Sequence, residues 1–283
     1  MDTFKISNSK LSTFWGCEQR YVWNYLEKLV PRTVDAPLKI GAAYHNGVAT
    51  ILHPTNKVMR PTDRLALAER TLERYCTENN MLDQLGTVMK YVQVYNSNIQ
   101  PFMDSFNMLS VEQWNETEVF TINGVKIYAI SKSDGIATAN GTGRIWVIEH
   151  KTAASMGPKK EIQFTDGAQI AQYSYVLRDL LRAPIYGVKF HFLVKTKAPK
   201  FYECTGLIDD RKLERWYDTA KNSVERMLQL EDGATAIQNL SSCNGPFYEC
   251  KYKPLCNHGL NSATKNMFTE KTELKPTEGG ILA

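Results

Sequence analysis

The chain has 283 residues, of which 43% are hydrophobic and 23% charged, and its formal net charge is +4. These values are ordinary for a soluble globular protein with a real core, and the mild positive charge permits a polyanionic partner without requiring one. No apolar run is long enough to cross a bilayer and the N-terminus lacks a signal peptide, so we expect a cytoplasmic chain without a membrane partner. In that setting the six cysteines favour reduced thiols or metal ligands over disulfides.

The N-terminal part of the chain has the residue spacing of helices. Apolar residues at helical intervals, with Ser or Asn near the start, predict a helix over residues 8–29, and a second short helix is expected at 40–52. Two longer helical patterns follow at about 61–80 and 84–108. We therefore expect a helical elaboration, at about 40–110, inserted before the sheet.

Alternating apolar and polar residues then predict two hairpins. Residues 115–131 alternate around Asn123-Gly124, a dipeptide typical of tight hairpin turns. A second hairpin is expected at 134–151, turning on the Asn-Gly-Thr-Gly loop at 140–143. The Trp-Val-Ile run that precedes Glu149 places apolar residues on both faces, as in a central strand that is covered on both sides.

The rest of the chain completes a mixed sheet with a helix inserted between strands. In chain order we expect a helix, two strands and a helix, at about 165–182, 185–195, 200–207 and 210–230. A turn-rich segment with three cysteines follows, and residues 259–283 are polar enough to predict a loose tail. The order of elements predicts a single α/β domain over residues 1–258.

The second hairpin brings two carboxylates together. A symmetric loop at 140–143 sets a register in which Asp134 lies directly opposite Glu149, with Cβ atoms roughly 5 Å apart on one face of the sheet. Lys151 shares this face because it lies two residues beyond Glu149, whereas His150 points to the opposite face.

Facing carboxylates repel, and a divalent cation between them removes the conflict. Oxygen ligands that leave positions for water suit Mg²⁺ or Mn²⁺ better than Zn²⁺. The ammonium of Lys151 can then stabilise a nucleophilic water or offset the charge of a phosphate. The alternative is a solvated strand end on which Asp134 and Lys151 form a surface ion pair. The apolar run before Glu149 favours the metal site, because it predicts a covered strand.

These residues resemble the D…E-x-K signature of the PD-(D/E)XK nuclease superfamily. Further segments resemble its RecB-type branch and occur in that branch's order: SNSKLSTFWGCEQRYVWNYL (7–26), GAAYH (41–45), QIAQY (169–173) and CNGPFYECKYKPLC (243–256). Two departures are visible. Glu18 stands where the branch commonly has Pro, and Ser131 stands where it often has Gly before the Asp.

The resemblance implies a restriction-endonuclease-like fold, with a mixed β-sheet core flanked by helices. It also implies a hydrolase, an Mg²⁺- or Mn²⁺-dependent deoxyribonuclease that cleaves phosphodiester bonds. On this resemblance Asp134, Glu149 and the backbone carbonyl of His150 bind the metal, and His45 is an additional ligand. A lone histidine on an Ala-rich helix is otherwise more often structural than a ligand.

The remaining catalytic positions that the resemblance implies are Lys151, Gln169 and Tyr173. Lys151 acts on the attacking water. Gln169 and Tyr173 share one helix face by their i, i+4 spacing and position the lysine or the substrate phosphate. By composition alone, Gln169 would be a solvated helix residue and Tyr173 a core aromatic.

The C-terminal cysteines need a separate explanation. Cys243, Cys250 and Cys256 lie in a segment with few apolar residues, where a metal staple makes physical sense. In several RecB-type relatives one N-terminal and three C-terminal cysteines hold a 4Fe–4S cluster, and Cys17 is the corresponding fourth ligand here. The spacing departs from the usual pattern, because Phe247 stands where a cysteine is expected. Structural Zn²⁺ and free thiols stay open as alternatives.

We therefore predict a DNA exonuclease acting on ends or single strands, similar to compact nucleases of phages and mobile elements that serve recombination, replication or DNA degradation. A recombination protein or a single-strand-binding protein is a candidate partner. Two alternatives are a CRISPR-adaptation-type nuclease and a non-catalytic DNA-binding iron–sulfur subunit, and the complete Asp134, Glu149 and Lys151 set argues against the second. Basic residues near the motifs are candidates for tracking the DNA backbone: Arg20, Lys159, Lys160, Lys195, Lys197 and Lys200.

Overall fold

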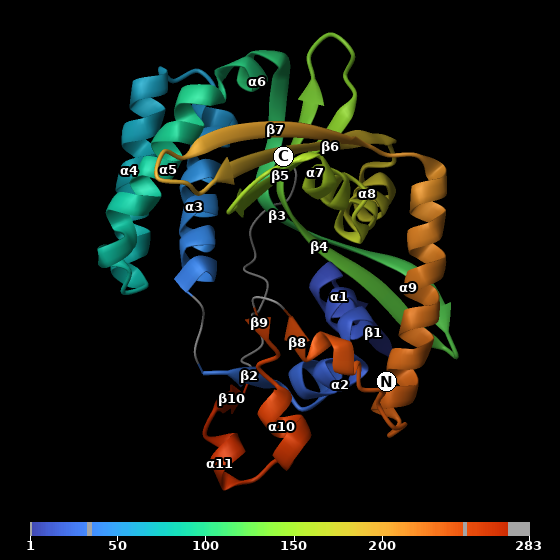
Figure 1. Cartoon of the computed structure of the whole chain (residues 1–283). Coiled ribbons are helices and arrows are strands. Elements are labelled where there is room, and N and C mark those ends of the chain that lie inside the picture. Colours follow the sequence, from blue (N-terminus) through green and yellow to red (C-terminus); the bar gives the residue numbers. More distant parts are fainter. Residues whose placement is uncertain (1, 33–35, 246–247, 271–283) are drawn as a thin grey trace. The chain divides into compact units, whose positions relative to one another are not determined.

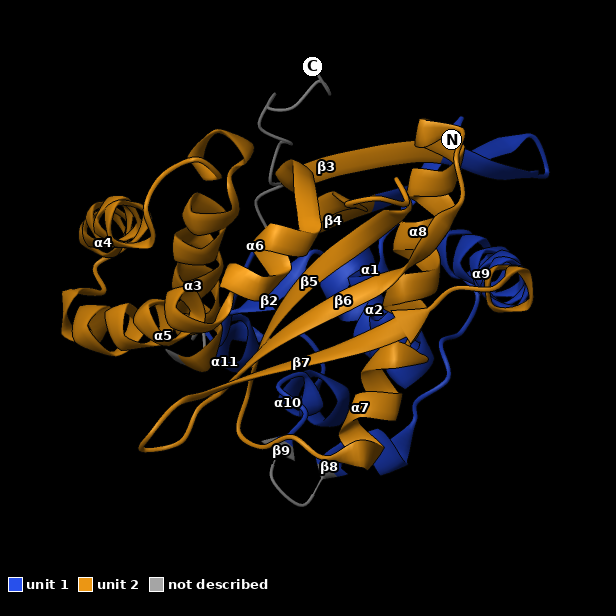
Figure 2. Cartoon of the chain, turned by 90° about the horizontal axis from the view of Figure 1, so that it is seen from above, with its two compact units in different colours: residues 1–34, 118–130, 214–277 blue, residues 35–117, 131–213, 278–283 orange. Residues whose placement is uncertain are grey.

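The computed structural model describes residues 2–32, 36–245 and 248–270. The chain divides into two compact units, each assembled from separated stretches of sequence (Figure 2). Unit 1 comprises residues 1–34, 118–130 and 214–277, and unit 2 comprises residues 35–117, 131–213 and 278–283. The single domain expected over residues 1–258 stays a prediction. None of the helices in the described ranges is long and apolar enough to cross a membrane.

Unit 2 opens with helices, which Figure 1 labels α3 (Ala36–Leu52), α4 (Pro61–Glu78), α5 (Leu85–Asn98) and α6 (Gln100–Ser105), and with 3₁₀ turns η2 (Pro54–Asn56) and η3 (Leu82–Gln84). Apolar side chains at helical spacing, such as Ala68, Leu72 and Cys76 on α4, form one buried core. The helices expected at 40–52 and 61–80 are confirmed. The helix expected at 84–108 is wrong at its end, because Pro101 starts the separate helix α6 and a strand begins at Phe106.

The strands of unit 2 form a mixed sheet in the order β4-β5-β6-β7, with β3 beside β4. Their bounds are β3 (Phe106–Ile122), β4 (Val125–Ala139), β5 (Ile145–Ala153), β6 (Ile185–Val194) and β7 (Lys200–Leu207). The β5–β6 pair is parallel, whereas the β4–β5 and β6–β7 pairs are antiparallel. This arrangement confirms the predicted α/β class with a mixed sheet core. β3 and β4 continue into unit 1, where β4 pairs with β1 (Thr3–Ile6).

Helices cover both faces of this sheet. One face contributes Ala137, Trp146 and Ile148 to the core of α3, α4 and α5. The other face contributes Ile136 and Val147 to a second core, which it shares with α8 (Ala168–Leu181). α7 (Pro158–Thr165), which the sequence did not predict, precedes α8. β5 is buried on both faces, as expected of a central strand.

Both predicted hairpin turns are present, and the predicted register of the second is confirmed. Asn123 and Gly124 have φ of 50° and 82°, the left-handed backbone that a two-residue hairpin turn requires. In the second hairpin Gly135 pairs with Ile148 and Ala137 pairs with Trp146. Asp134 and Glu149 occupy the next position of the same register.

Unit 1 contains the N-terminal elements α1 (Asn8–Gly16), α2 (Glu18–Tyr21), the π-helical turn η1 (Val22–Leu26) and β2 (Leu29–Pro31), together with most of α9 (Asp210–Glu231). The single helix expected at 8–29 is wrong, because the backbone of Cys17 is extended, with φ −173° and ψ 120°, and separates α1 from α2. The helix expected at 210–230 is confirmed.

The C-terminal part of unit 1 consists of short elements: η4 (Leu240–Ser242), β8 (Asn244–Gly245), β9 (Tyr248–Glu249), α10 (Lys253–His258), α11 (Ser262–Lys265) and β10 (Phe268–Glu270). The loose tail expected from residue 259 is wrong as far as Glu270. β10 pairs with β2 and buries Phe268, so an apolar residue in this polar stretch anchors it. The remainder, 271–283, lies outside the described residues.

Candidate active site

Two buried carboxylates lie side by side where β4 and β5 pair. Asp134 and Glu149 are only 8% and 4% exposed, although each is ionisable. The Oδ2 atom of Asp134 accepts the backbone N–H of His150 at 2.7 Å, which fixes its position at the strand pair. Burial and the charge of Asp134 raise the pKa of Glu149, because two buried negative charges repel each other. The predicted conflict between these carboxylates is therefore present.

His45 approaches Asp134 from α3. Its Nδ1 atom lies 3.2 Å from Oδ1 of Asp134, so this carboxylate is contacted from both the helix and the sheet. Burial alone would lower the pKa of His45, but Asp134 raises it. Burial alone would raise the pKa of Asp134, but His45 and the N–H of His150 lower it.

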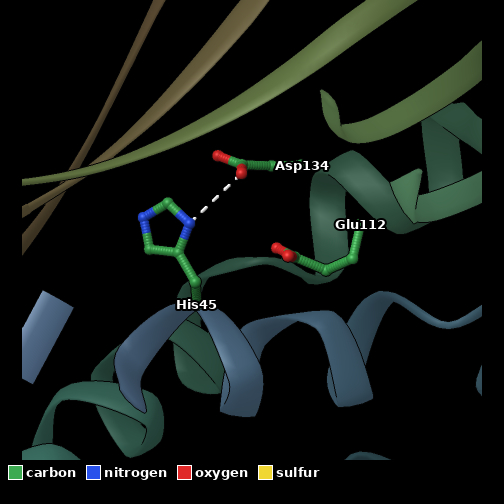
Figure 3. A group of neighbouring side chains, drawn as sticks. All are labelled: His45, Glu112 and Asp134. Carbon is green, nitrogen blue, oxygen red and sulfur yellow. Dashed lines mark hydrogen bonds and ion pairs between the residues drawn. The ribbon is translucent and has the colours of Figure 1, made fainter. Parts of the chain in front are cut away.

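Glu112 of β3 joins this pair and was missed in the sequence. One ligand atom each of His45, Glu112 and Asp134 lies within 4.8 Å of the others, and Figure 3 shows their side chains directed toward a common space. The sequence pattern predicted a helix that ends near residue 108 and a strand that begins near residue 115. Glu112 therefore belonged to no predicted element. The signal that extends the strand upstream to include it is a set of apolar residues: Phe106, Met108, Leu109 and Val111.

Lys151 and Gln169 both bind the carboxylate of Glu149. The ammonium of Lys151 forms an ion pair with Oε1 of Glu149, so the two side chains share a face as predicted. On α8, Gln169 donates its amide to the same oxygen at 2.7 Å and to the hydroxyl of Tyr173 at 2.9 Å. The imidazole of His150 packs against the rings of His45 and Tyr95, with ring centroids 6.0 and 5.4 Å away. The action of Gln169 and Tyr173 on the lysine or on a phosphate stays a prediction.

The geometry of these residues agrees with what comparison of the whole chain finds. A family model described as the PD-(D/E)XK nuclease superfamily matches residues 5–257. The chain belongs to this superfamily. The assignment of its D…E-x-K signature to Asp134, Glu149 and Lys151 stays a prediction. No curated protein matches the chain.

A solved structure supports the fold of this nuclease. The crystal structure called “Putative exonuclease” from Eubacterium rectale has a TM-score of 0.53 and covers 90% of this chain and 94% of its own. The two sequences are 13% identical, so the similarity shows a shared fold and leaves the substrate to be argued from the site.

The donor set of the nuclease site fits a divalent cation. In the described part of the chain, Oε2 of Glu149 and Oε1 of Glu112 are shielded from solvent and have no hydrogen-bond partner. Buried carboxylate oxygens without partners are unfavourable unless a cation satisfies them. Carboxylate oxygens are the ligands that Mg²⁺ and Mn²⁺ prefer.

The cysteines predicted to act together all lie in unit 1: Cys17, Cys243, Cys250 and Cys256. Three of them are linked by backbone contacts: the Cys250 N–H donates to the Cys243 carbonyl at 2.8 Å, and the Asn239 backbone contacts the sulfurs of both Cys243 and Cys17. N–H groups point at two of the sulfurs: the Trp23 indole N–H lies 3.4 Å from Sγ of Cys256, and the Asn239 backbone N–H lies 3.4 Å from Sγ of Cys17. Phe247, at the departure in spacing, lies outside the described residues.

The two other cysteines are buried structural residues. Cys76 and Cys204 are buried in the cores of unit 2. Burial raises the pKa of the Cys204 thiol to about 12, which keeps it protonated and inert.

Proposed function

We propose that this nuclease is a metal-dependent DNA exonuclease of the RecB-type branch that uses Mg²⁺ or Mn²⁺ and acts on DNA ends or single strands, as compact phage and mobile-element nucleases do. The carrying observation is the buried pair Asp134 and Glu149, placed at one position of the β4–β5 register with Lys151 bound to Glu149. Phosphodiester hydrolysis needs neutralisation of the attacking and leaving oxygens rather than covalent help, and this arrangement supplies the charges for it.

Different side chains of the site would bind the cation and orient the attacking water. Asp134, Glu149 and the carbonyl of His150, with His45, would hold the metal ion, which supplies Lewis acidity to the phosphate and the attacking water. Gln169 and Lys151 both occupy Oε1 of Glu149, which leaves Oε2 for the cation. The ammonium of Lys151 has protons to donate and no acceptor, so its role is to orient water and offset phosphate charge.

The sheet edge that holds this site also carries basic residues for a DNA backbone. β5 and β6 are parallel, and Ala153 pairs with Val194, so Lys195 follows at the same strand ends as Lys151. The backbone N–H of Lys195 donates to the carbonyl of Ala153 at 2.7 Å, which keeps it there. Lys197 lies in the same turn and is exposed. Cationic side chains at this edge suit a polyanionic strand.

For the four cysteines of unit 1 we propose a structural 4Fe–4S cluster. Asn239 contacts two of these cysteines, which come from opposite ends of the chain: its backbone N–H points at Sγ of Cys17, and its carbonyl lies 3.8 Å from Sγ of Cys243. The N–H groups at Cys17 and Cys256 are of the kind that stabilise cluster thiolates.

The test uses anaerobically purified protein and end-labelled single- and double-stranded DNA, with Mg²⁺, Mn²⁺ or a chelator. We expect metal-dependent degradation that Lys151→Ala reduces by about 10²-fold or more, because charge stabilisation of the transition state is lost. Lys221→Ala, an exposed lysine of α9, is the control and retains activity. Labels at either end report the polarity. DNA left intact by the wild type under every metal condition would overturn the proposal in favour of a non-catalytic DNA-binding subunit.

A further inference from the structure

The alternation of exposed and buried side chains along β3 shifts by one residue beside the active site. Upstream, Asn107 and Leu109 are exposed; downstream, Trp114 and Glu116 are exposed, so the alternation shifts by one residue between them. Glu112, within the shifted stretch, has φ of 52°, a left-handed backbone that residues other than glycine rarely adopt. One extra residue with left-handed backbone in a strand is a β-bulge, a feature that commonly re-aims a side chain next to a functional site.

The bulge directs the carboxylate of Glu112 toward His45 and Asp134 (Figure 3). Its two oxygens have different surroundings. Oε2 forms an ion pair with Lys132 of β4, whereas Oε1 is shielded from solvent and has no hydrogen-bond partner among the described residues. The outer oxygen is therefore anchored and the inner one is left for a ligand.

Glu149 repeats this division independently, from another strand. Its Oε1 is bound by Lys151 and Gln169, and its Oε2 is buried without a partner in the described part of the chain. Glu149 is 4% exposed, so bulk solvent does not reach this oxygen. Glu112 thus presents one desolvated oxygen to Asp134 and His45, with one ligand atom of each residue within 4.8 Å of the others, and two carboxylates with an imidazole are a donor set for a hard cation.

We propose that Glu112 is a further ligand of the divalent cation, and that the bulge in β3 exists to deliver it. The proposal rests on the proposed function and deepens it, since it assigns a ligand to the same site. A strained backbone at a non-glycine residue is retained when the side chain has a task that the relaxed conformation cannot perform. Glu112 is then a residue that lowers the stability of the metal-free protein and raises its affinity for the cation.

Two substitutions separate these effects. Glu112→Gln keeps the shape and removes the charge, and we expect it to weaken Mn²⁺ binding to the metal-free protein by about 10- to 100-fold, measured by titration calorimetry. Glu112→Gly accepts the left-handed backbone, so we expect the same loss of affinity together with a metal-free Tm that is higher by about 2–4 °C. A residue with only a structural role would show the opposite, a lower Tm with unchanged affinity.

Controls keep this test distinct from that of the proposed function. Glu116→Gln, on the exposed side of the same strand, should bind Mn²⁺ as the wild type does. Lys151→Ala should reduce hydrolysis by about 10²-fold or more while Mn²⁺ still binds, because this ammonium is not a metal ligand. Unchanged affinity in Glu112→Gln, in a wild-type background that cleaves DNA, overturns this inference and leaves the proposed function standing. A wild type that neither binds Mn²⁺ nor cleaves DNA overturns both.

Discussion

The carboxylate site of unit 2 and the cysteine group of unit 1 are assembled in opposite ways. The carboxylates lie on paired strands whose register places them, and apolar cores cover both faces of that sheet. The cysteines come from the two ends of the chain, near residue 17 and between residues 243 and 256. Contacts around them are correspondingly long-range: Trp23 donates to Cys256, which lies 233 positions further along the chain. The apolar cluster beside them has only Tyr252, Leu255 and Phe268 as buried members among the described residues.

The two sites should therefore differ in whether their ligand side chains are already in position before a metal ion or cluster binds. Ordering a segment costs conformational entropy that apolar burial must offset. The sheet of unit 2 offsets that cost by burying its own apolar residues. Its carboxylates therefore keep their positions whether or not a cation is bound. The short elements around the cysteines bury little, so a bound cluster would provide a large part of their folding free energy.

The largest effect should follow from loss of a cluster ligand. Cys256→Ser should lower the protection of the α10 and β10 amides against hydrogen exchange by about 10²-fold or more, because local folding is linked to cluster binding. The amides of β5 and β6 should keep their protection. Hydrogen exchange followed by mass spectrometry, on anaerobically prepared protein, measures both regions at once.

The control for this change is Cys204→Ala, which removes a buried cysteine from a core of unit 2. It should weaken unit 2 alone and leave α10 and β10 as they are. Equal protection of α10 in Cys256→Ser and the wild type would mean that the four cysteines are free thiols, and the contrast between the two regions would disappear.

An intermediate effect is expected at Glu18, where the RecB-type branch commonly has Pro. Either residue suits the first position of a helix, Pro by its backbone and Glu by its charge. Here Glu18 also receives Arg226 at 2.9 and 3.1 Å and the backbone N–H of Ile237 at 2.9 Å. Glu18→Gln should lower the free energy of unfolding of unit 1 by about 2 kcal/mol, because charged hydrogen bonds are lost.

Denaturant titration followed by tryptophan fluorescence checks the Glu18 prediction. The matched control is Asp63→Asn, which breaks the exposed pair of Asp63 with Arg60 on α4. Exposed pairs contribute little, so this change should leave the denaturation midpoint close to that of the wild type. If both variants lose the same stability, the Glu18 pair is no more than a surface contact.

The parts of this fold that the sequence predicted are those determined by local pattern. Asn123-Gly124 and the loop at 140–143 specify their turns, and the turn then determines the register that places Asp134 beside Glu149. The central position of β5 followed from apolar residues on both of its faces. These features depend on neighbours in the sequence, so a single sequence is enough to infer them.

The parts that were missed depend on contacts between distant segments. Glu112 acquires its position from a bulge, which no local pattern announced, and from Lys132 on the neighbouring strand. The break at Cys17 replaces a regular helix because the extended backbone there lets its sulfur reach the N–H of Asn239. β10 forms because Phe268 finds a partner strand near the other end of the chain. None of these partners is visible at short range.

The smallest predicted effect is confined to unit 2. It is the converse of the Cys256→Ser prediction, because here the sheet is disturbed and α10 is not. Glu203 on β7 accepts from Lys189 at 2.9 Å and lies 3.4 Å from Nε2 of the buried His191. The proximity of the His191 imidazole, helped by Lys189 and opposed by burial, lowers the pKa of Glu203 to about 2. A carboxyl whose folded pKa is lowered stabilises the protein above its unfolded pKa of about 4.3, and this contribution is lost as the pH falls through the folded value.

Because 33% of the Glu203 side chain is exposed, we expect Glu203→Gln to cost only about 1 kcal/mol at pH 7. The stability of the variant should also fall less steeply than that of the wild type between about pH 4.3 and pH 2. Urea titrations across this pH range measure the difference, with Glu225→Gln on the exposed side of α9 as the control. Amide exchange should increase in β6 and β7 and stay unchanged in α10. Increased exchange in α10 as well would mean that the cysteine region folds together with the sheet and does not depend mainly on its cluster.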